Sequence, residues 1–161
     1  MVKSNNRKVA VLLHDIRSTH NVGSMFRTAD ALGINEVYIS GYTPAPIDKF
    51  GKARQDIAKV ALGAEKSLSW QSLEDPVLQI KKLKKEGWKI VAIEQSKNSI
   101  DYKKVKISYP VLFLVGNEVE GIPDNMLSLC DIVSEIQMRG GKESLNVSVA
   151  FGVALFRILG V

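Results

Sequence analysis

Three short polar segments interrupt apolar sequence and carry the side chains that could do chemistry. They are residues 21–27 (NVGSMFR), 116–121 (GNEVEG) and 144–150 (SLNVSVA). Each follows or interrupts a run that is typical of a buried strand or helix, where polar side chains are tolerated only when they find partners. The first two also contain glycine, which allows close backbone approach. We therefore interpret the three segments as parts of one composite site.

Familiar nucleotide-binding and metal-binding patterns are missing from the sequence. No G-x-G-x-x-G follows the first apolar run and no G-x-x-x-x-G-K-[ST] occurs, so neither a dinucleotide fold of that type nor a P-loop is predicted. His14 and His20 are the only histidines, and no His, Cys and carboxylate cluster has metal-ligand spacing. We expect no metal, and we interpret His20 as a loop residue.

Strands and helices alternate along the chain, which predicts an α/β fold with a mainly parallel sheet and helices on both faces. The expected strands are 9–13, 36–40, 66–70, 88–93, 111–115 and 131–136. The expected helices are 22–32, 54–62, 74–86, a short one near Pro123, and 145–159. Ligands of such folds bind beyond the carboxyl ends of the strands. The three polar segments follow strands and should meet at that edge.

Composition indicates one globular domain, residues 1–161, with residues 1–8 as a flexible N-terminal tail. The chain is 45% hydrophobic and 24% charged, which is ordinary for a soluble protein. The single Cys130 fits a reducing compartment and indicates a buried, inert thiol. No signal peptide or membrane-spanning stretch is recognisable, so a cytoplasmic protein without a membrane partner is expected.

The net charge of +5 is concentrated in one part of the sequence. Residues 81–106 hold nine lysines and three acidic residues, a local net charge of +6. Such a stretch favours a phosphate-rich partner, because neutralised phosphates release counterions. For residues 81–85 alone, a solvated helix face is the alternative.

Two other segments carry expectations of their own. The helix expected at 145–159 is apolar almost all round, so it needs cover on most sides, and a partner subunit could supply it. Residues 41–51 contain two prolines and should form a loop long enough to be functional or mobile. Whether this loop closes on a substrate is left open.

The three segments together resemble the motifs of the SpoU (TrmH-type) branch of the SPOUT RNA methyltransferases. The matching residues are Asn21-x-Gly23-x-x-x-Arg27, Gly116-Asn-Glu118-x-x-Gly121, and Met138 followed by Ser144-Leu-Asn146-Val-Ser148. The resemblance extends from Val9 to the end of the chain. It implies a deep C-terminal trefoil knot, a homodimer, S-adenosylmethionine bound in the knot, and methyl transfer to a ribose 2′-hydroxyl of tRNA or rRNA. It implies no DNA partner.

The resemblance also assigns catalytic roles. Arg27 would act on the 2′-hydroxyl or its neighbouring phosphate, while Asn21, Glu118, Ser144 and Asn146 would order the site. Two of these residues have simpler explanations that stay open, since Asn21 and Ser144 could each be a helix N-cap. Glu118 directly follows a buried strand and needs a partner, for which Arg27 of the partner subunit is a candidate.

The cofactor site implied by the resemblance draws on residues that follow several strands. They are Glu94, Gly116, Ile136, Met138, Ser144 and Leu145. Backbone groups near Ile136, Met138 and Leu145 would read the adenine. Two positions depart from the family pattern: Gln137 replaces a usual proline that would stiffen that loop, and Ser24 replaces a common asparagine.

Two other functions remain open at this point. One is a non-catalytic, SPOUT-like dimer that binds RNA, and the other is a small-molecule methyltransferase on the same scaffold. Retention of Arg27, Glu118 and Asn146 argues against the first, and the lysine-rich stretch argues against the second. The chain lacks the extra terminal domains of many rRNA-directed relatives, which favours tRNA over rRNA as the expected substrate.

Overall fold

A computed structural model describes residues 7–161, so most of the tail expected at 1–8 lies outside the described residues. One seven-stranded sheet has the order β3-β2-β1-β6-β4-β7-β5, with every neighbouring pair parallel. Its strands are β1 Val9–His14, β2 Glu36–Ser40, β3 Trp70–Leu73, β4 Lys89–Ile93, β5 Ile100–Asp101, β6 Val111–Val115 and β7 Ile132–Glu135. The helices are α1 Thr19–Ala31, α2 Gln55–Ala61, α3 Ala64–Ser67, α4 Pro76–Lys85, α5 Asp124–Leu127, α6 Val147–Leu159 and the 3₁₀ turn η1 Tyr102–Lys104.

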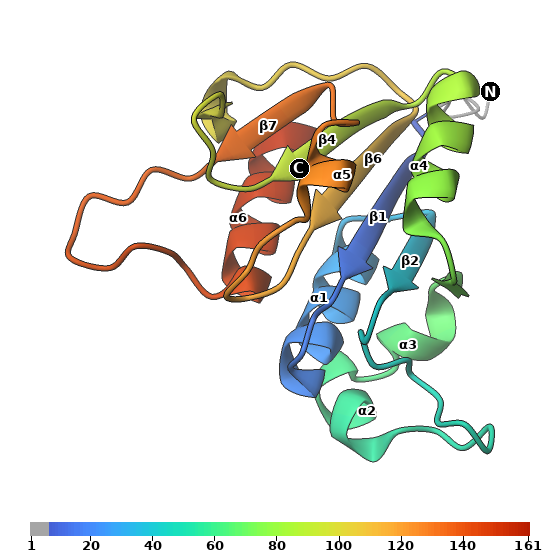
Figure 1. Ribbon diagram of the computed structural model, residues 1–161. Helices are drawn as coiled ribbons and strands as arrows, with labels where there is room; N and C mark the ends of the chain where they lie inside the picture. Colours follow the sequence, from blue (N-terminus) through green and yellow to red (C-terminus); the bar gives the residue numbers. More distant parts are fainter. Residues whose placement is uncertain (1–6) are drawn as a thin grey trace, which may run out of the picture.

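Helices cover both faces of the sheet, as the strand–helix alternation predicts (Figure 1). The central strands β1 and β6 are buried along their whole length because each has a hydrophobic cluster on either side. One cluster packs against α1, α2, α3 and α6, and the other against α4 and α5. Continuous apolar runs in the sequence are typical of such two-sided burial.

One strand prediction is wrong. Residues 66–70 were expected to be a strand, but Ala64–Ser67 form the short helix α3 and β3 begins only at Trp70. Leu62 and Gly63 both adopt positive φ, at 53° and 95°, which ends α2 and starts the next turn. The carboxylate of Glu65 accepts a hydrogen bond from the Gly63 amide at 3.0 Å, which holds that turn.

The first glycine of the polar segments has a packing role. Gly23 lies inside α1, and a Cβ built there would be 2.8 Å from the carbonyl oxygen of Ile57 and 2.9 Å from the Cβ of Val60. Both neighbours belong to α2, so α1 and α2 approach each other more closely than a side chain at this position would allow. Gly23 therefore sets the position of α1 rather than contacting a ligand.

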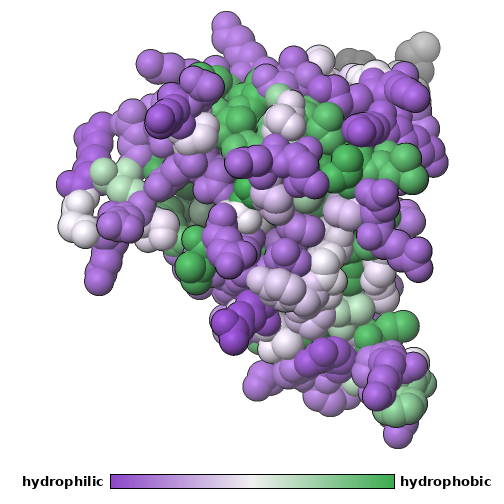
Figure 2. Space-filling model, viewed as in Figure 1, coloured by the Kyte–Doolittle hydropathy of each residue, from purple (hydrophilic) through white to green (hydrophobic). Residues whose placement is uncertain are grey.

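The lysine-rich stretch does not form one patch. Its first four lysines lie on the exposed side of α4, whereas Lys103 and Lys104 lie in η1, which packs beside α6 on the opposite face of the sheet. Figure 2 shows hydrophilic side chains over much of the face that carries α4. The sequence count of +6 is therefore divided between two surfaces. Within residues 7–161, every helix is too short or too polar to cross a bilayer.

Candidate functional site

A chain of hydrogen bonds joins the three polar segments. Oε1 of Glu118 accepts from Nδ2 of Asn21 at 3.0 Å, and Oδ1 of Asn21 accepts from Nδ2 of Asn146 at 3.2 Å. Oδ1 of Asn146 in turn accepts from the amide and the hydroxyl of Ser148, at 2.9 and 2.6 Å. Asn21 lies 97 positions from Glu118 and 125 positions from Asn146, and the fold brings these residues to one edge of the sheet as expected.

Glu118 binds the start of α1 within its own chain. Besides Asn21, its carboxylate accepts hydrogen bonds from the backbone amides of Arg17 at 3.2 Å and Ser18 at 3.3 Å. Burial alone would raise the pKa of Glu118, but these hydrogen bonds outweigh it and hold the pKa below 4.5. The carboxylate is thus ionised at neutral pH and has three donors, so it does not require Arg27 of a partner subunit.

The loop after β6 is tightly folded, which fixes the position of Glu118. A Cβ at Gly116 would lie 2.6 Å from the carbonyl group of Gly121, and Gly121 itself has φ of +71°. Oδ1 of Asn117 accepts from the amides of Val119 and Glu120, both at 2.8 Å. Glycine at both ends of the segment therefore allows the loop to close on itself.

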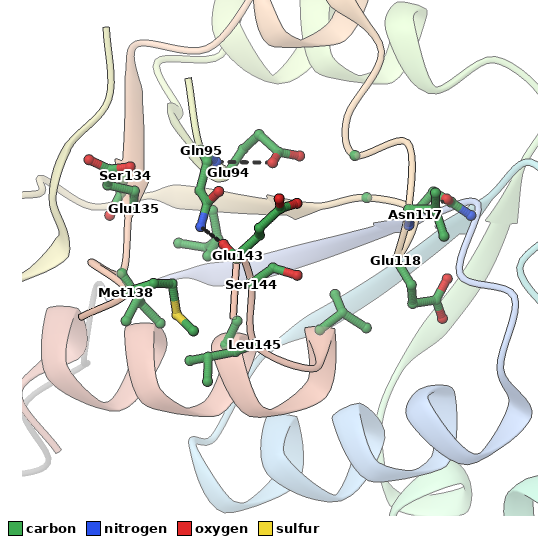
Figure 3. Close-up of a pocket in the computed structure, with 17 residues that line it drawn as sticks. Glu94, Gln95, Asn117, Glu118, Ser134, Glu135, Met138, Glu143, Ser144 and Leu145 are labelled. Carbon is green, nitrogen blue, oxygen red and sulfur yellow. Dashed lines mark hydrogen bonds between the residues drawn. The ribbon is translucent and has the colours of Figure 1, made fainter. Parts of the chain in front are cut away.

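A cavity of about 250 Å³ lies beside this loop, bounded by the segments that follow β4, β6 and β7 and by the start of α6 (Figure 3). All six positions that the family resemblance assigns to the cofactor line it: Glu94, Gly116, Ile136, Met138, Ser144 and Leu145. The cavity therefore gathers, in one place, residues that the sequence spreads over more than fifty positions.

The cavity wall combines apolar side chains with polar groups. Ser134, in β7, is fully buried, and its hydroxyl has no hydrogen-bond partner within residues 7–161. Gln95 donates from Nε2 to the backbone oxygen of Glu143 at 2.9 Å, which ties the loop before α6 to the segment after β4 (Figure 3). Oε2 of Glu94 accepts from the Ile122 amide at 2.9 Å. These contacts give the cavity a defined shape.

The structure corrects both helix-cap interpretations. Ser18, not Asn21, is the N-cap of α1, because its hydroxyl accepts from the Asn21 amide at 3.1 Å. Asn146, not Ser144, is the N-cap of α6. Each helix consequently begins two or three residues away from its expected start. Ser144 is exposed, and its side chain stands on the cavity-lining loop beside Glu143 and Leu145 (Figure 3).

Arg27 is the one expected catalytic residue that lies apart from the others. It is exposed on α1, six residues from Asn21, and lines neither this cavity nor an adjoining one that Arg17 and Tyr42 help to line. Its guanidinium makes no hydrogen bond or ion pair with any residue of the described range. A guanidinium without a partner is free to bind an anion.

A second cavity, of about 380 Å³, adjoins the first and was not anticipated from the sequence. Asn117, Glu118 and Val119 line both cavities, and Arg17 and Tyr42 are among the residues that line only the second. Tyr42 lies two residues beyond the end of β2 and belongs to no motif. Its place after a strand at the ligand-binding edge was the only available signal.

A polar cluster of His14, Asp15 and Ser40 lies next to Tyr42, whose amide donates to Asp15. Nδ1 of His14 lies 2.8 Å from the Ser40 hydroxyl and Nε2 lies 3.2 Å from Oδ2 of Asp15. Burial lowers the pKa of His14 more than the neighbouring Asp15 raises it, so the ring is neutral at pH 7. Because an ionised carboxylate only accepts, the neutral ring carries its proton on Nε2 and accepts from Ser40 on Nδ1.

Residues 7–161 contain no group of three or more His, Cys, Asp or Glu side chains that could hold a metal ion. Cys130 lies three residues beyond the end of α5, lines neither cavity, and is partly rather than fully buried. Burial, helped by Asp131, raises its thiol pKa to about 12. The expectation of an inert thiol is thereby supported by its environment.

Comparison with known proteins gives consistent matches over nearly the whole chain. The model of the SpoU rRNA Methylase family matches residues 8–156. The tRNA (guanosine(18)-2′-O)-methyltransferase of Aquifex aeolicus is 29% identical over 97% of this chain, and that of Escherichia coli K12 is 32% identical over 92%. The 23S rRNA (guanosine-2′-O-)-methyltransferase of Pseudomonas aeruginosa is 29% identical over 98%.

Solved structures agree with the sequence matches. The A. aeolicus TrmH/SpoU tRNA modifying enzyme superposes with a TM-score of 0.82 at 28% identity, covering 94% of this chain and 74% of that one. An AdoMet-bound rRNA methyltransferase from Sinorhizobium meliloti gives 0.82 at 25% identity, covering 94% and 55%. The chain spans 71% of the A. aeolicus relative and only 61% and 60% of the E. coli and P. aeruginosa relatives.

Proposed function

The chain belongs to the SpoU rRNA Methylase family, and from this we propose that it transfers a methyl group from S-adenosylmethionine to a ribose 2′-hydroxyl of RNA. One observation carries the proposal. The hydrogen bonds from Glu118 through Asn21 to Asn146 join the three motif segments directly beside a cavity lined by all six expected cofactor residues. A fold that had lost the activity would have little reason to keep this arrangement together.

The residues of the first cavity suit S-adenosylmethionine. Ile136, Met138 and Leu145 offer apolar surface for an adenine ring, and the unpartnered hydroxyl of Ser134 is a polar group that a bound ligand or an ordered water could satisfy. When bound, the cofactor supplies an electrophilic methyl group on a sulfonium centre. The protein then has to hold the acceptor oxygen in line with that methyl and exclude water.

Arg27 is the residue we propose to act on the acceptor. Its guanidinium is exposed and unpaired within residues 7–161, so it can bind the phosphate next to the reactive ribose or assist removal of the 2′-hydroxyl proton. A role as the base itself would require desolvation, because arginine is otherwise always protonated. Asn21, Glu118 and Asn146 act as positioning residues, and Ser144 stands on the rim of the first cavity.

We also propose a homodimer in which α6 lies at the interface. Val149, Val153 and Phe156 on this helix are 48%, 40% and 37% exposed, and a second copy would cover them. Such an interface would bring Arg27 of one copy towards the cavities of the other, which accounts for its separation from them in one chain. We further propose that the chain is a single catalytic domain with the deep trefoil knot that the family resemblance implies.

For the substrate we propose tRNA in the cytoplasm. Two of the relatives named above are tRNA (guanosine(18)-2′-O)-methyltransferases and one acts on 23S rRNA, so both RNA classes must be tested. The deciding experiment maps 2′-O-methyl positions across total tRNA and rRNA from cells with and without this protein. Loss of one or more sites in tRNA supports the proposal, whereas loss only in rRNA corrects the substrate.

The activity is tested directly with purified protein and RNA from the deletion strain. Arg27→Ala is expected to abolish methylation while S-adenosylmethionine binding, measured by calorimetry, is retained. Lys59→Ala, which removes an exposed cation from the neighbouring helix α2, is the matched control and should leave the rate unchanged. RNA binding without cofactor binding would instead identify a non-catalytic RNA-binding protein, and methylation of nucleosides but not RNA a small-molecule enzyme.

A further inference from the structure

We infer that the second cavity binds the acceptor nucleoside, unstacked from its RNA, with Tyr42 as the stacking platform for its base. The inference rests on the proposed function and adds to it a substrate site and a residue outside the three motifs. The cavity has a volume of about 380 Å³.

The cavity lies where the chain connections diverge. β1 and β6 are neighbours in the sheet, but β1 leads into α1 on one face and β6 leads through its loop to α5 on the other. Open parallel sheets bind ligands at such a switch point, beyond the carboxyl ends of the strands. Arg17 from the β1 loop and Asn117 from the β6 loop line the cavity from its two sides.

The second cavity also adjoins the first cavity, the proposed site of the methyl donor. Asn117, Glu118 and Val119 line both cavities, so the two cavities adjoin at this loop and a ligand in the second can approach a methyl donor in the first. In-line transfer requires the reacting atoms to lie about 3–3.5 Å apart, which demands that donor and acceptor sites adjoin. The acceptor nucleoside therefore has to occupy space of this kind next to Glu118.

Tyr42 is held rigidly although 56% of it is exposed. Its amide donates to Oδ1 of Asp15 at 3.1 Å, and its hydroxyl oxygen accepts from Nδ2 of Asn117 at 2.6 Å. Asp15 has φ of 52°, and Gly41, at φ of 64°, leaves room for the Asp15 carboxylate where a Cβ would collide with it. An exposed aromatic ring fixed at both ends is prepared to stack on a base without losing freedom on binding.

The polar groups around Tyr42 suit a nucleotide. The NH₂ group of Asn117 donates to the Tyr42 hydroxyl oxygen and to a backbone oxygen, and the Asn117 side-chain oxygen already accepts from two backbone amides. Asn117 therefore does not accept the Tyr42 hydroxyl hydrogen, which is free to donate to a ligand. Desolvation and the nearby carboxylates, Asp15 foremost, raise the pKa of Tyr42, so the hydroxyl stays protonated. Arg17 is exposed at the same cavity, where its guanidinium can meet the phosphate that accompanies the base.

The test follows the tyrosine rings by NMR, because the chain has only four tyrosines. Tyr42→Phe identifies the Tyr42 signal by its loss. Guanosine, cytidine and uridine 5′-monophosphates are then titrated at saturating S-adenosylhomocysteine, which keeps the first cavity filled. We expect at least one of them to shift the Tyr42 signal while those of Tyr38, Tyr102 and Tyr109 stay in place.

Variants measure the contribution of the ring. Tyr42→Ala should weaken nucleotide binding about 5- to 100-fold, as expected for loss of one base–aromatic stack, and Tyr42→Phe should weaken it far less. Phe50→Ala is the matched control, since Phe50 is 76% exposed on the same connection but lines neither cavity. It should bind like the unchanged protein.

The outcomes separate this inference from the proposed function. If S-adenosylhomocysteine binds but no nucleotide shifts the Tyr42 signal, or nucleotides merely compete for the first cavity, the inference is overturned and the proposed function stands. Equal losses in Tyr42→Ala and Phe50→Ala also overturn it. If nucleotides shift the Tyr42 signal in a protein that never binds S-adenosylhomocysteine, the site is supported and the methyl-transfer function is rejected.

Discussion

Glu118 accepts a hydrogen bond from the side-chain amide of Asn21 at 3.0 Å, and this contact fixes which way the amide faces. An ionised carboxylate can only accept, so the NH₂ group of Asn21 must point to Glu118 and its oxygen to the NH₂ group of Asn146. The order of donors and acceptors is therefore the same from the loop after β6 to the start of α6. Turning any one of these side-chain amides around would leave a polar group unpaired.

Asn21→Asp should destabilise the protein by about 2 kcal/mol, because Asn21 is only 6% exposed and the change puts a second carboxylate against Glu118. Urea unfolding at pH 7 measures this loss. Adding Glu118→Gln to the same chain exchanges donor and acceptor and should restore much of it. If the double variant is no more stable than Asn21→Asp alone, the pair is not coupled as described.

Glu118 should also make stability depend on pH. Its pKa is lowered on folding from an ordinary value of 4.5, so the folded state binds fewer protons than the unfolded state below about pH 5. The stabilisation is present above pH 4.5 and is lost as the pH falls through the lower pKa of the folded state. In urea unfolding between pH 3.5 and 7, the stability advantage over Glu118→Gln should shrink at the acid end. A constant difference would contradict the lowered pKa.

Gly23→Ala should destabilise the protein by about 1–3 kcal/mol, since the added methyl meets the backbone of α2 at 2.8 Å and something must shift. Gly152→Ala in α6 is the matched control. A Cβ there meets only a Thr28 methyl at 3.6 Å, so the helix should gain about 0.5–1 kcal/mol from the better helix former. Thermal unfolding compares the two variants, and equal changes would mean that the α1–α2 contact is not tight.

Sequence reasoning predicted most of the fold because apolar runs bounded by turn residues are strong signals. The strands at 36–40 and 111–115 have the expected bounds. The prediction failed at 66–70. Leu62 ends α2 with a positive φ, which this residue type rarely adopts, and a second short helix follows that the pattern of side chains does not predict. The predicted starts of α1 and α6 were wrong by two or three residues, because Ser18 and Asn146 each have polar neighbours in the sequence that could equally have been the N-cap of the helix.

Sequence reasoning anticipated that residues of the three segments meet at one cavity, but it did not anticipate their contacts. The family resemblance named six of the residues that line the first cavity, and the parallel sheet explained why they meet. The partner of Glu118 was not predictable, since Asn21 lies 97 positions away and both could have bound many other groups. Tyr42 was missed because its significance comes from Asp15 and Asn117, which hold it from two other loops.

Cys130 should react slowly with alkylating reagents in the native protein. Only the thiolate reacts, and burial raises the pKa of Cys130 from 9.0 to about 12. At pH 8 this lowers the thiolate fraction about 1,000-fold relative to the unfolded chain, if each pKa unit counts tenfold. Labelling with iodoacetamide, followed by mass spectrometry, should therefore be at least about 100-fold slower in buffer than in concentrated urea. Glutathione alkylated under both conditions corrects for the effect of urea on the reagent, and similar rates for Cys130 would show that its thiol is not held in a desolvated environment.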